Sequence, residues 1–184
     1  NGVNLKKLNN TSAADFRKDN LGFIFQEYFL LDSLTIRENI SVPLTLQKLP
    51  PKKIEDMVRS LAERFGIASQ LNKYPSELSG GQRQRASAAR AIVKQPSILF
   101  ADEPTGALDS NSATELLNTL QEANQEINTT ILMVTHDAYA ASFANRILIF
   151  KDGCIIRELQ KDNGNRRDFY EAIANEIAKL DTER

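Results

Sequence analysis

The sequence predicts an α/β fold in which a parallel sheet is combined with a helical insertion. Two apolar runs, residues 98–101 and 130–134, have the continuous hydrophobicity of parallel strands that are buried on both faces. Stretches with helical spacing lie between and around these runs, and strands that alternate with helices form layered α/β domains. Residues 30–78 carry helical patterns without a strand signal, which identifies them as the insertion.

The first half of the chain contains one predicted strand and two predicted helices. Residues 21–25 form a short apolar run that is typical of a buried strand. Residues 34–41 predict a short helix, and Pro43 is expected to break the chain after it. Residues 52–65 place their apolar side chains on one helical face, and Gly66 is a plausible helix stop.

The second half alternates helices with strands and ends in a hairpin and a helix. Residues 79–93 predict a helix, and Asp109 or Ser110 is expected to cap the next one. Asp152-Gly153 between two apolar stretches predicts a hairpin, and a terminal helix is expected over residues 167–180. We therefore expect four segments: a partial α/β core over 1–29, a helical subdomain over 30–90, further α/β core over 91–160 and a C-terminal helix over 161–184.

Composition restricts the class of protein. The chain has 184 residues, of which 41% are hydrophobic and 26% charged, and its net charge is −1. This balance is typical of a soluble globular protein and gives no general attraction to nucleic acid. No apolar run approaches the roughly 20 residues that a membrane helix needs. The single cysteine, Cys154, excludes an internal disulfide, fits a reducing cytoplasm and is expected to be buried in the hairpin.

Polar residues follow the two central strands at the edge where parallel sheets bind ligands. Asp102 and Glu103 come directly after one strand, and His136, the only histidine, follows the other. Adjacent acids are costly to desolvate unless they are paired or bound to a metal, so one carboxylate suits Mg²⁺ and the other suits a water molecule. The alternatives are that the acids only cap the loop before Pro104 and that His136 is an ordinary histidine at a strand end.

Ser79, Gly80 and Gly81 lie where a helix is expected to begin. Free backbone N–H groups and the helix dipole favour anions at such a position, and glycine permits a phosphate to approach closely. The alternative is an ordinary serine N-cap followed by flexible glycines. The next residues include three arginines that are expected to form salt bridges: Arg83, Arg85 and Arg90.

The segment after the first strand allows two interpretations. Gln26 ends that strand, and four bulky residues follow closely, namely Tyr28, Phe29, Leu30 and Leu31. They are either part of the hydrophobic core of the helical insertion or an exposed docking patch. The sequence pattern leaves both open.

Taken in order, these features resemble the nucleotide-binding domain of ATP-binding cassette (ABC) transporters. Five segments carry the resemblance: Phe25-Gln26-Glu27 is similar to the Q-loop, Leu78–Gln82 to the signature, Ile98–Glu103 to the Walker B strand, Ala107-Leu108-Asp109 to the D-loop and His136 to the H-loop. The resemblance implies a P-loop NTPase-like parallel-sheet core with a helical ABC subdomain. It also implies ATP and Mg²⁺ as cofactors.

The resemblance implies a role for each residue at the edge of the sheet. Asp102 would hold Mg²⁺, and Glu103 would polarise the attacking water. His136 would contact the γ-phosphate. Gln26 would touch the metal and the attacking water and would couple them to a membrane subunit. That transmembrane permease would dock near Tyr28, Phe29 and Leu30.

The resemblance also implies a head-to-tail homodimer of nucleotide-binding subunits with two ATP molecules between them. Asp109 would cross this interface. The signature residues would bind the γ-phosphate of the ATP that the second subunit holds: Ser79, Gly80, Gly81 and Gln82. ATPases of chromosome maintenance share the signature, but their long coiled coil has no counterpart in this sequence, so nucleic acid is not an expected partner.

Two local features narrow the resemblance. Residues 34–40, following Phe25-Gln26, resemble the branch that includes lipoprotein-release and macrolide-export ATPases, and residues 164–170 with Ile173 resemble the tail of bacitracin-type antimicrobial peptide transporters. The implied function is ATP hydrolysis that powers export of a peptide, lipid-linked or drug-like substrate, at the inner face of the plasma membrane. The alternative is a non-enzymatic assembly module that lends its signature face to a complete cassette.

One element of the family pattern is missing, because no Gly-x-x-x-x-Gly-Lys-Ser/Thr loop occurs in the sequence. Residues 1–5 resemble the segment just after the Walker A helix, so the chain is expected to be a fragment that lacks the first strands and this loop. Losing a single stabilising donor of this kind commonly costs about 2.7–4 kcal/mol of transition-state stabilisation. The chain alone is therefore expected neither to bind ATP tightly nor to hydrolyse it, and its open sheet edges favour oligomerisation.

Overall fold

The computed structural model describes residues 4–162 and 165–182. The chain forms two compact units that are divided between Met133 and Val134. We refer to them as the N-terminal unit and the C-terminal unit. Residues 1–3 and Gly164, which carry parts of the family resemblance, lie outside the described residues.

A three-stranded sheet forms the base of the N-terminal unit. The strands are β1 (Leu21–Ile24), β2 (Ile98–Asp102) and β3 (Thr130–Val134), in the order β1-β2-β3. β1 and β2 are parallel, in a register that pairs Leu21 with Ile98 and Ile24 with Ala101. All three predicted strands are present, and the predicted α/β class is confirmed.

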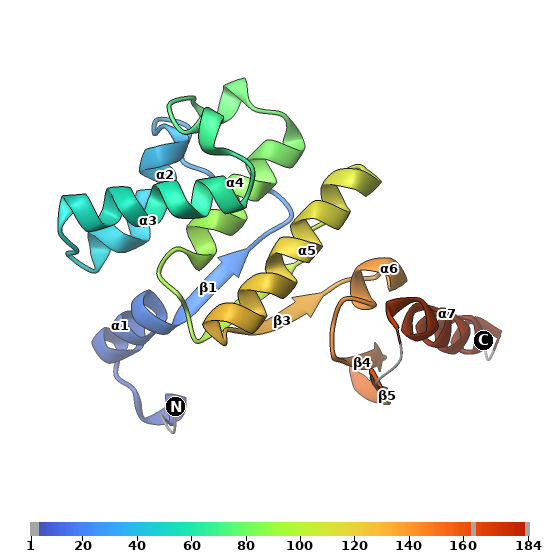
Figure 1. The fold of residues 1–184 in the computed structure, drawn as a ribbon. Coiled ribbons are helices and arrows are strands. Elements are labelled where there is room, and N and C mark those ends of the chain that lie inside the picture. Colours follow the sequence, from blue (N-terminus) through green and yellow to red (C-terminus); the bar gives the residue numbers. More distant parts are fainter. Residues whose placement is uncertain (1–3, 163–164, 183–184) are drawn as a thin grey trace. The chain divides into compact units, whose positions relative to one another are not determined.

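Helices cover one face of this sheet. Figure 1 shows α5 (Ser110–Ile127) crossing the sheet, while α2, α3 and α4 gather as a helical cluster. The core side chains of the strands, Ile24, Leu99 and Ala101, are at most 1% exposed. The expectation that the strands are buried on both faces is wrong. Phe23 of β1 is 39% exposed and Leu132 of β3 is 53% exposed, whereas their neighbours along each strand are more buried. These strands therefore follow the alternating pattern of a sheet with one covered face.

The helical cluster consists of α2 (Ile36–Leu46), α3 (Pro51–Arg64) and α4 (Gly80–Ile92). The prediction that a helix ends before Pro43 is wrong, because α2 continues through this proline to Leu46. Ile36, Ile40 and Leu44 lie on one face and are completely buried, so their packing offsets the hydrogen bond that proline removes. The predicted stop after α3 is confirmed, since Gly66 has a φ of +63°.

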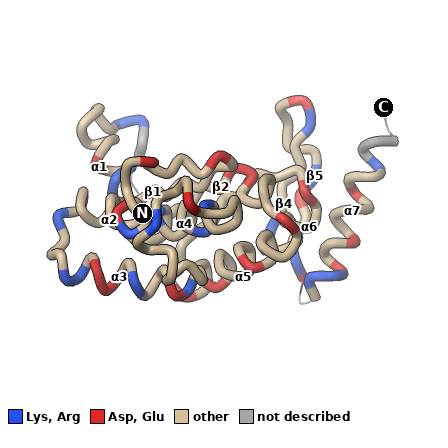
Figure 2. The backbone as a smooth tube through the Cα atoms, turned by 90° about the horizontal axis from the view of Figure 1, so that it is seen from above, with Lys and Arg blue, Asp and Glu red and all other residues tan. Residues whose placement is uncertain are grey.

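The outer face of α3 is charged and the inner face is apolar. Figure 2 shows Lys and Arg alternating with Asp and Glu along this helix. Val58 and Ala62 are completely buried, as the helical periodicity predicts. Glu55 accepts hydrogen bonds from Arg37 of α2 and, at 3.2 Å, from Arg59 of α3.

Helix α1 (Asn10–Asn20) was not predicted from the sequence. None of its residues is buried, so it has no apolar stripe that a periodicity analysis could detect. Its start is fixed locally, because the Asn9 side chain accepts a hydrogen bond from the Ser12 N–H at 2.8 Å. Short 3₁₀ turns also occur, at Leu5–Lys7, Ala68–Gln70 and Pro75–Glu77.

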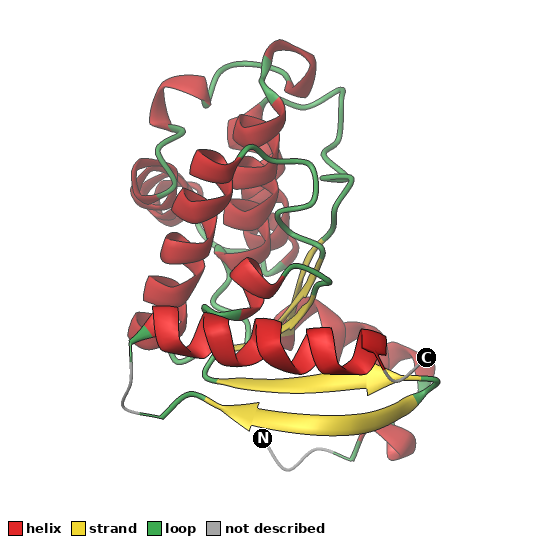
Figure 3. Ribbon diagram, turned by 90° about the vertical axis from the view of Figure 1, so that its right-hand side faces the viewer, coloured by secondary structure: helices red, strands yellow, loops and turns green. Residues whose placement is uncertain are grey.

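The C-terminal unit contains a hairpin and two helices. The strands β4 (Arg146–Lys151) and β5 (Cys154–Gln160) pair in an antiparallel arrangement around the predicted turn, with a bulge between Ile149 and Phe150. Helix α7 (Arg166–Thr182) runs beside this hairpin (Figure 3). Cys154 was expected to be buried, but it is exposed, because it lies at the end of the hairpin that the turn closes.

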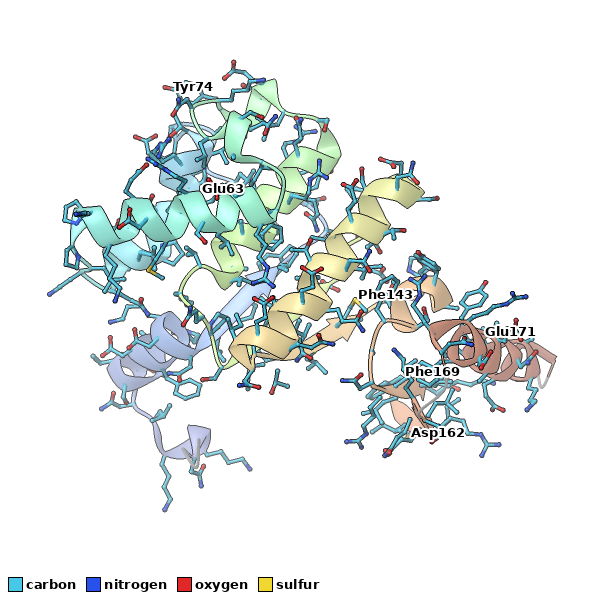
Figure 4. The ribbon with its side chains drawn as sticks, in the orientation of Figure 1. Glu63, Tyr74, Phe143, Asp162, Phe169 and Glu171 are labelled. Carbon is cyan, nitrogen blue, oxygen red and sulfur yellow. The ribbon has the colours of Figure 1, made fainter. Side chains whose placement is uncertain are left out.

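A small aromatic core holds α7 against the short helix α6 (Ala138–Ala141). Phe143 and Phe169, labelled in Figure 4, are each 7% exposed. The guanidinium of Arg166 lies 4.3 Å from the centre of the Phe143 ring and 5.1 Å from that of Tyr139. Among the described residues, no helix is long and apolar enough to cross a membrane.

Candidate active site

The carboxyl ends of β1 and β2 bring three of the predicted site residues to one edge of the sheet. Because the two strands are parallel and their register ends at Ile24 and Ala101, Gln26 and Asp102 leave the sheet at the same edge. Asp102 is the last residue of β2 and is exposed, and Glu103 follows it in a half-buried position. Glu103 has a φ of +43°, in the left-handed region that side chains rarely adopt.

The Gln26 side chain lies against the turn that Glu103 begins. The N–H of Gly106 donates to the carbonyl oxygen of Glu103 at 3.1 Å, which closes this turn. A Cβ atom added at Gly106 would lie 3.1 Å from Gln26 Nε2 and 3.3 Å from its Cδ. A side chain at this position would press on the Gln26 amide, so Gly106 is a site residue that the sequence analysis missed.

The signature segment Ser79–Gln82 forms the start of α4. The Ser79 hydroxyl accepts a hydrogen bond from the Gln82 N–H at 3.3 Å, and the Gln82 amide oxygen accepts one from the Ser79 N–H at 3.0 Å. This reciprocal pair is a capping box, so the ordinary N-cap interpretation of Ser79 describes its local geometry correctly. The N–H groups of Gly80 and Gly81, at the first positions of the helix, belong to those that have no partner within a helix.

Both signature glycines are packed closely. A Cβ atom at Gly80 would lie 3.1 Å from the Tyr28 hydroxyl, and one at Gly81 would lie 3.0 Å from Ser112 Oγ. Ser112 lies in the first turn of α5, so the N-terminal ends of α4 and α5 meet at this point. The helix dipole and free N–H groups at the start of α4 favour an anion, whereas the start of α5 already holds the Asp109 carboxylate.

Asp109 is the N-cap of α5, which decides between the two predicted caps. Its carboxylate accepts hydrogen bonds from the N–H groups of Asn111 and Ser112, at 3.1 and 3.0 Å, and from the Ser112 hydroxyl at 2.7 Å. The bond from the Ser112 N–H is the largest cause that holds the pKa of Asp109 below its ordinary value. The Asp109 carboxylate is therefore held in place beside the signature segment by three hydrogen bonds.

His136 is carried by the C-terminal unit, two residues after the end of β3. The next residue, Asp137, caps α6 by accepting a hydrogen bond from the Tyr139 N–H at 2.8 Å. The N–H of Asp137 donates to the Thr135 hydroxyl at 3.1 Å. The backbone on both sides of His136 is thus held by local hydrogen bonds.

The residues at the edge of the sheet fit Mg²⁺ only as partial ligands. In the described parts of the chain, no group of three or more His, Cys, Asp or Glu side chains could hold a metal ion. Mg²⁺ is usually bound by one or two carboxylates together with phosphate oxygens and water. An exposed carboxylate at Asp102 and an amide oxygen at Gln26 are suitable oxygen ligands for an ion that arrives with a phosphorylated substrate.

Helix α4 also holds the segment that follows Gln26, here called the 28–31 segment. The Ser87 hydroxyl donates to the carbonyl oxygen of Tyr28 at 2.8 Å, and the Arg90 guanidinium donates to those of Tyr28 and Phe29 at 3.0 and 2.6 Å. Burial lowers the pKa of Arg90 from its ordinary value. These contacts hold Tyr28 and Phe29 at φ values of +57° and +45°.

The three arginines after the signature do not all form the predicted salt bridges. Arg85 pairs with Glu115 of α5, as expected. Arg83 instead lies over the ring of Tyr28, 5.2 Å from its centre. Arg90 donates to backbone carbonyl oxygens instead of to a carboxylate. Every residue type carries such an oxygen, so the sequence alone does not reveal this contact.

The 28–31 segment is partly core and partly surface. Leu30 is half-buried and packs on the core of the N-terminal unit, whereas Phe29 is 58% exposed and Leu31 is 48% exposed. An open hollow of about 230 Å³ lies between this segment, Pro75 and Arg83. Both interpretations of the sequence therefore apply, each to different residues.

A buried glutamine was missed altogether. Gln84 lies on α4, 1% exposed, among residues that the helical pattern marks as core. Its Nε2 donates to the carbonyl oxygens of Phe25 and Pro104, at 3.2 and 2.7 Å. A polar residue on the apolar face of a helix was the one available signal, because buried polar groups require partners.

Comparison with known proteins agrees with this geometry. The sequence model of the family described as ABC transporter matches residues 2–106. The chain is 51% identical, over 172 residues, to the bacitracin export ATP-binding protein BceA of Halalkalibacterium halodurans, covering 94% of this chain and 68% of that protein. It is 46% identical, over 180 residues, to the ABC transporter ATP-binding protein YxdL of Bacillus subtilis, covering 98% and 70% of the two chains.

A more distant relative and a solved structure show the same similarity. The macrolide export ATP-binding/permease protein MacB of Vibrio parahaemolyticus is 43% identical over 158 residues, which are 86% of this chain and 24% of that protein. The dimeric post-hydrolysis state of the ATP-binding cassette MJ0796, bound to ADP and phosphate, superposes with a TM-score of 0.76 at 34% identity. That match covers 84% of this chain and 68% of the other.

Proposed function

Because the chain belongs to the ABC transporter family, as an ATP-binding subunit, we propose that the intact subunit hydrolyses ATP at the carboxyl edge of this sheet to drive export. The observation that carries the proposal is the contact of the Gln26 side chain with the turn that begins at Glu103. This contact places an amide that suits a water molecule or metal ion beside the turn that follows Glu103, whose carboxylate can polarise water. Positioning of this kind is nearly all of the catalysis in phosphoryl transfer.

Each edge residue has a proposed role. Asp102 would hold Mg²⁺ together with Gln26, and the ion would neutralise charge on the phosphates. Glu103 would orient and polarise the attacking water as a general base, and His136 would contact the γ-phosphate. A positioned general base contributes about 10²–10⁴-fold to the rate, so loss of the Glu103 carboxylate should be readily measured in kcat.

A second subunit would complete the site. We propose that Ser79, Gly80, Gly81 and Gln82 bind the γ-phosphate of the ATP on the facing copy, in a head-to-tail dimer that Asp109 crosses. The N-terminal end of α4 supports an anion at this place. The dimeric state of the similar cassette MJ0796 supports the same assembly.

A membrane permease would dock on the 28–31 segment. The exposed Phe29 and Leu31 offer an apolar contact beside the hollow lined by Glu27, Asp32 and Arg83. Since this segment follows Gln26 directly, docking would be linked to the hydrolytic edge. This assembly would place the subunit on the cytoplasmic side of the plasma membrane.

The names of the relatives suggest the exported substrate. Two of these relatives are exporters named for bacitracin and for macrolides. We propose a peptide antibiotic of the bacitracin class as the substrate, because the relative with 51% identity is named for bacitracin export.

The 184 residues contain no Gly-x-x-x-x-Gly-Lys-Ser/Thr loop, and we propose that on their own they do not turn over ATP.

The test is Mg-ATP hydrolysis by the intact subunit that carries this sequence, compared with Glu103→Gln and with the exposed control Asn118→Gln. Glu103→Gln should lower kcat by about 10²–10⁴-fold while ATP binding, measured by titration, is retained. Asn118→Gln should behave like the parent. If the intact subunit binds ATP but never hydrolyses it, alone or with its permease, the hydrolytic function is wrong and the signature face serves assembly only.

A further inference from the structure

Gln84 connects three parts of the candidate site through one side chain. It lies two residues after the signature segment Ser79–Gln82, on the same helix. Its single Nε2 atom donates one hydrogen bond to the carbonyl oxygen of Phe25, the residue before Gln26. It donates a second to the carbonyl oxygen of Pro104, the residue after Glu103.

The two acceptors are held as a pair. An amide nitrogen carries two hydrogens at a fixed angle, so the positions of both carbonyl oxygens are fixed relative to each other and to α4. The two backbone segments therefore follow α4 when it moves. Gln26 and Glu103, which each adjoin one of the acceptors, would shift in the same step.

The conformation of Glu103 supports this reasoning. Its φ of +43° is strained for a residue with a side chain, and such a conformation persists only where the surroundings hold it. The hydrogen bond from Gln84 to the next carbonyl group, at 2.7 Å, is one such restraint. Loss of this bond should release the turn at the point where the strain is stored.

The chemistry of the side chain differs from that of a core-filling residue. Gln84 is 1% exposed, and its Oε1 atom has no hydrogen-bond partner among the residues that the structure describes. A buried acceptor without a partner is unfavourable, so the amide is a costly choice for packing alone. Its donor group is the part that the surrounding structure uses.

We infer that Gln84 is a positioning residue that couples the signature segment to Gln26 and Glu103. The inference rests on the proposed function, because it assigns the coupled elements to phosphate binding and water activation. Binding of a phosphate group at the start of α4 would be transmitted through this amide to the residues that act on the attacking water. The hydrolytic edge would thus respond to occupancy at the signature segment.

The test compares Gln84→Met and Gln84→Glu with the exposed glutamine variant Gln125→Met, each in the intact subunit. Methionine keeps the length of the side chain but removes both donors. We expect kcat to fall by between about tenfold and 10²-fold, with a much smaller change in KM, because misplacement of catalytic groups acts on the chemical step. Gln125→Met should keep the parent values.

Gln84→Glu adds a readout that packing alone would not move. A buried carboxylate facing two carbonyl oxygens is disfavoured, so burial should raise its pKa, and the protonated form can donate one hydrogen bond. Its kcat should therefore recover, relative to the parent, as the pH is lowered from about 8 to about 6. An activity ratio that does not vary with pH would overturn the inference.

Hydrogen exchange tests the coupling independently of hydrolysis. In Gln84→Met, exchange should accelerate in residues 25–29 and 103–108, while α4 stays protected. Unchanged exchange in these two segments, or acceleration spread over α4 and the core, would overturn the inference. If the parent subunit does not hydrolyse ATP, the proposed function fails, and the exchange pattern still decides the role of Gln84.

Discussion

Asn39 and Leu31 exchange two hydrogen bonds across the loop that leads into α2. The Leu31 N–H donates to Asn39 Oδ1 at 2.8 Å, and Asn39 Nδ2 donates to the Leu31 carbonyl oxygen at 3.0 Å. The same Nδ2 lies 3.1 Å from the carbonyl oxygen of Leu34 and 3.0 Å from that of Thr35. Since Asn39 is completely buried, this one side chain organises the backbone between the 28–31 segment and α2.

Replacing Asn39 with alanine should destabilise the N-terminal unit. Several backbone groups would lose their partner inside the protein, and each buried group left without a partner costs about 1–3 kcal/mol. We expect the free energy of unfolding to fall by about 2–4 kcal/mol, measured by urea denaturation. Asn118→Ala, at an exposed position of α5, is the matched control and should change it by less than about 0.5 kcal/mol. Equal values for the two variants would contradict the structural role of Asn39.

The sequence was sufficient to predict the structure where the determining interaction is local. Ser79 and Asp109 cap α4 and α5 as their residue types predict, because an N-cap uses backbone groups two or three residues away. The apolar runs of β2 and β3 likewise predicted both strands and the placement of Asp102 at a sheet edge. Local chemistry of this kind is written in consecutive residues.

The sequence was insufficient to predict an interaction where the partner of a side chain is distant along the chain. Gln84 binds carbonyl oxygens that are 59 and 20 residues away in the chain, and any residue type supplies a carbonyl oxygen. The extension of α2 past Pro43 depends in the same way on burial of Leu44 against the rest of the core. The prediction that Cys154 is buried was wrong, because the two-stranded β4–β5 sheet leaves this residue exposed and the sequence pattern does not reveal it.

The capping box of α2 should give a measurable pH dependence of stability. The Thr35 N–H and hydroxyl donate to the Glu38 carboxylate, both at 2.8 Å, and the bond from the N–H is the larger cause that lowers the pKa of Glu38. A carboxyl group with a lowered pKa in the folded state stabilises the protein above its unfolded pKa, and this contribution is lost as the pH falls through the folded pKa.

Glu38→Gln isolates this contribution. The amide oxygen can still accept from Thr35, so the variant should resemble the parent near neutral pH and lose less stability on acidification. Thermal unfolding between about pH 7 and pH 3 measures the difference, since other carboxylates titrate equally in both proteins. Glu63→Gln, on the exposed surface of α3 (Figure 4), should keep the acid dependence of the parent. Parallel curves for Glu38→Gln and the parent would show that the capping box contributes no charge-dependent stability.

Arg166 should stabilise the C-terminal unit through the rings of Tyr139 and Phe143. Its guanidinium contacts both rings and donates to the Tyr139 hydroxyl at 3.2 Å. A cation over an aromatic ring contributes about 0.5–2 kcal/mol, depending on its burial. We expect Arg166→Ala to accelerate proteolysis of α7 in limited digestion, and Arg166→Lys to restore part of the protection because lysine lacks the planar group.

Arg167 provides the control for this prediction, because it lies on the same helix but forms only an exposed ion pair. Its side chain is 85% exposed and pairs with Glu171 one turn later, at 3.2 Å. Exposed pairs of this spacing contribute about 0.3–0.5 kcal/mol, so Arg167→Ala should leave the digestion rate nearly unchanged. If both alanine variants are digested at the same rate, the contact with the two rings does not hold α7.

Gly106→Ala should impair hydrolysis without impairing folding. The added Cβ would lie 3.1 Å from Gln26 Nε2, and this atom is at the far end of a flexible side chain that can move away. We therefore expect an unchanged thermal midpoint and a kcat reduced by between about tenfold and 10²-fold, because Gln26 would leave the turn of Glu103. In a double-mutant cycle, Gly106→Ala should have little further effect once Gln26→Ala is present. Additive losses in the double variant would mean that the glycine acts on the turn itself and that the contact with Gln26 is incidental.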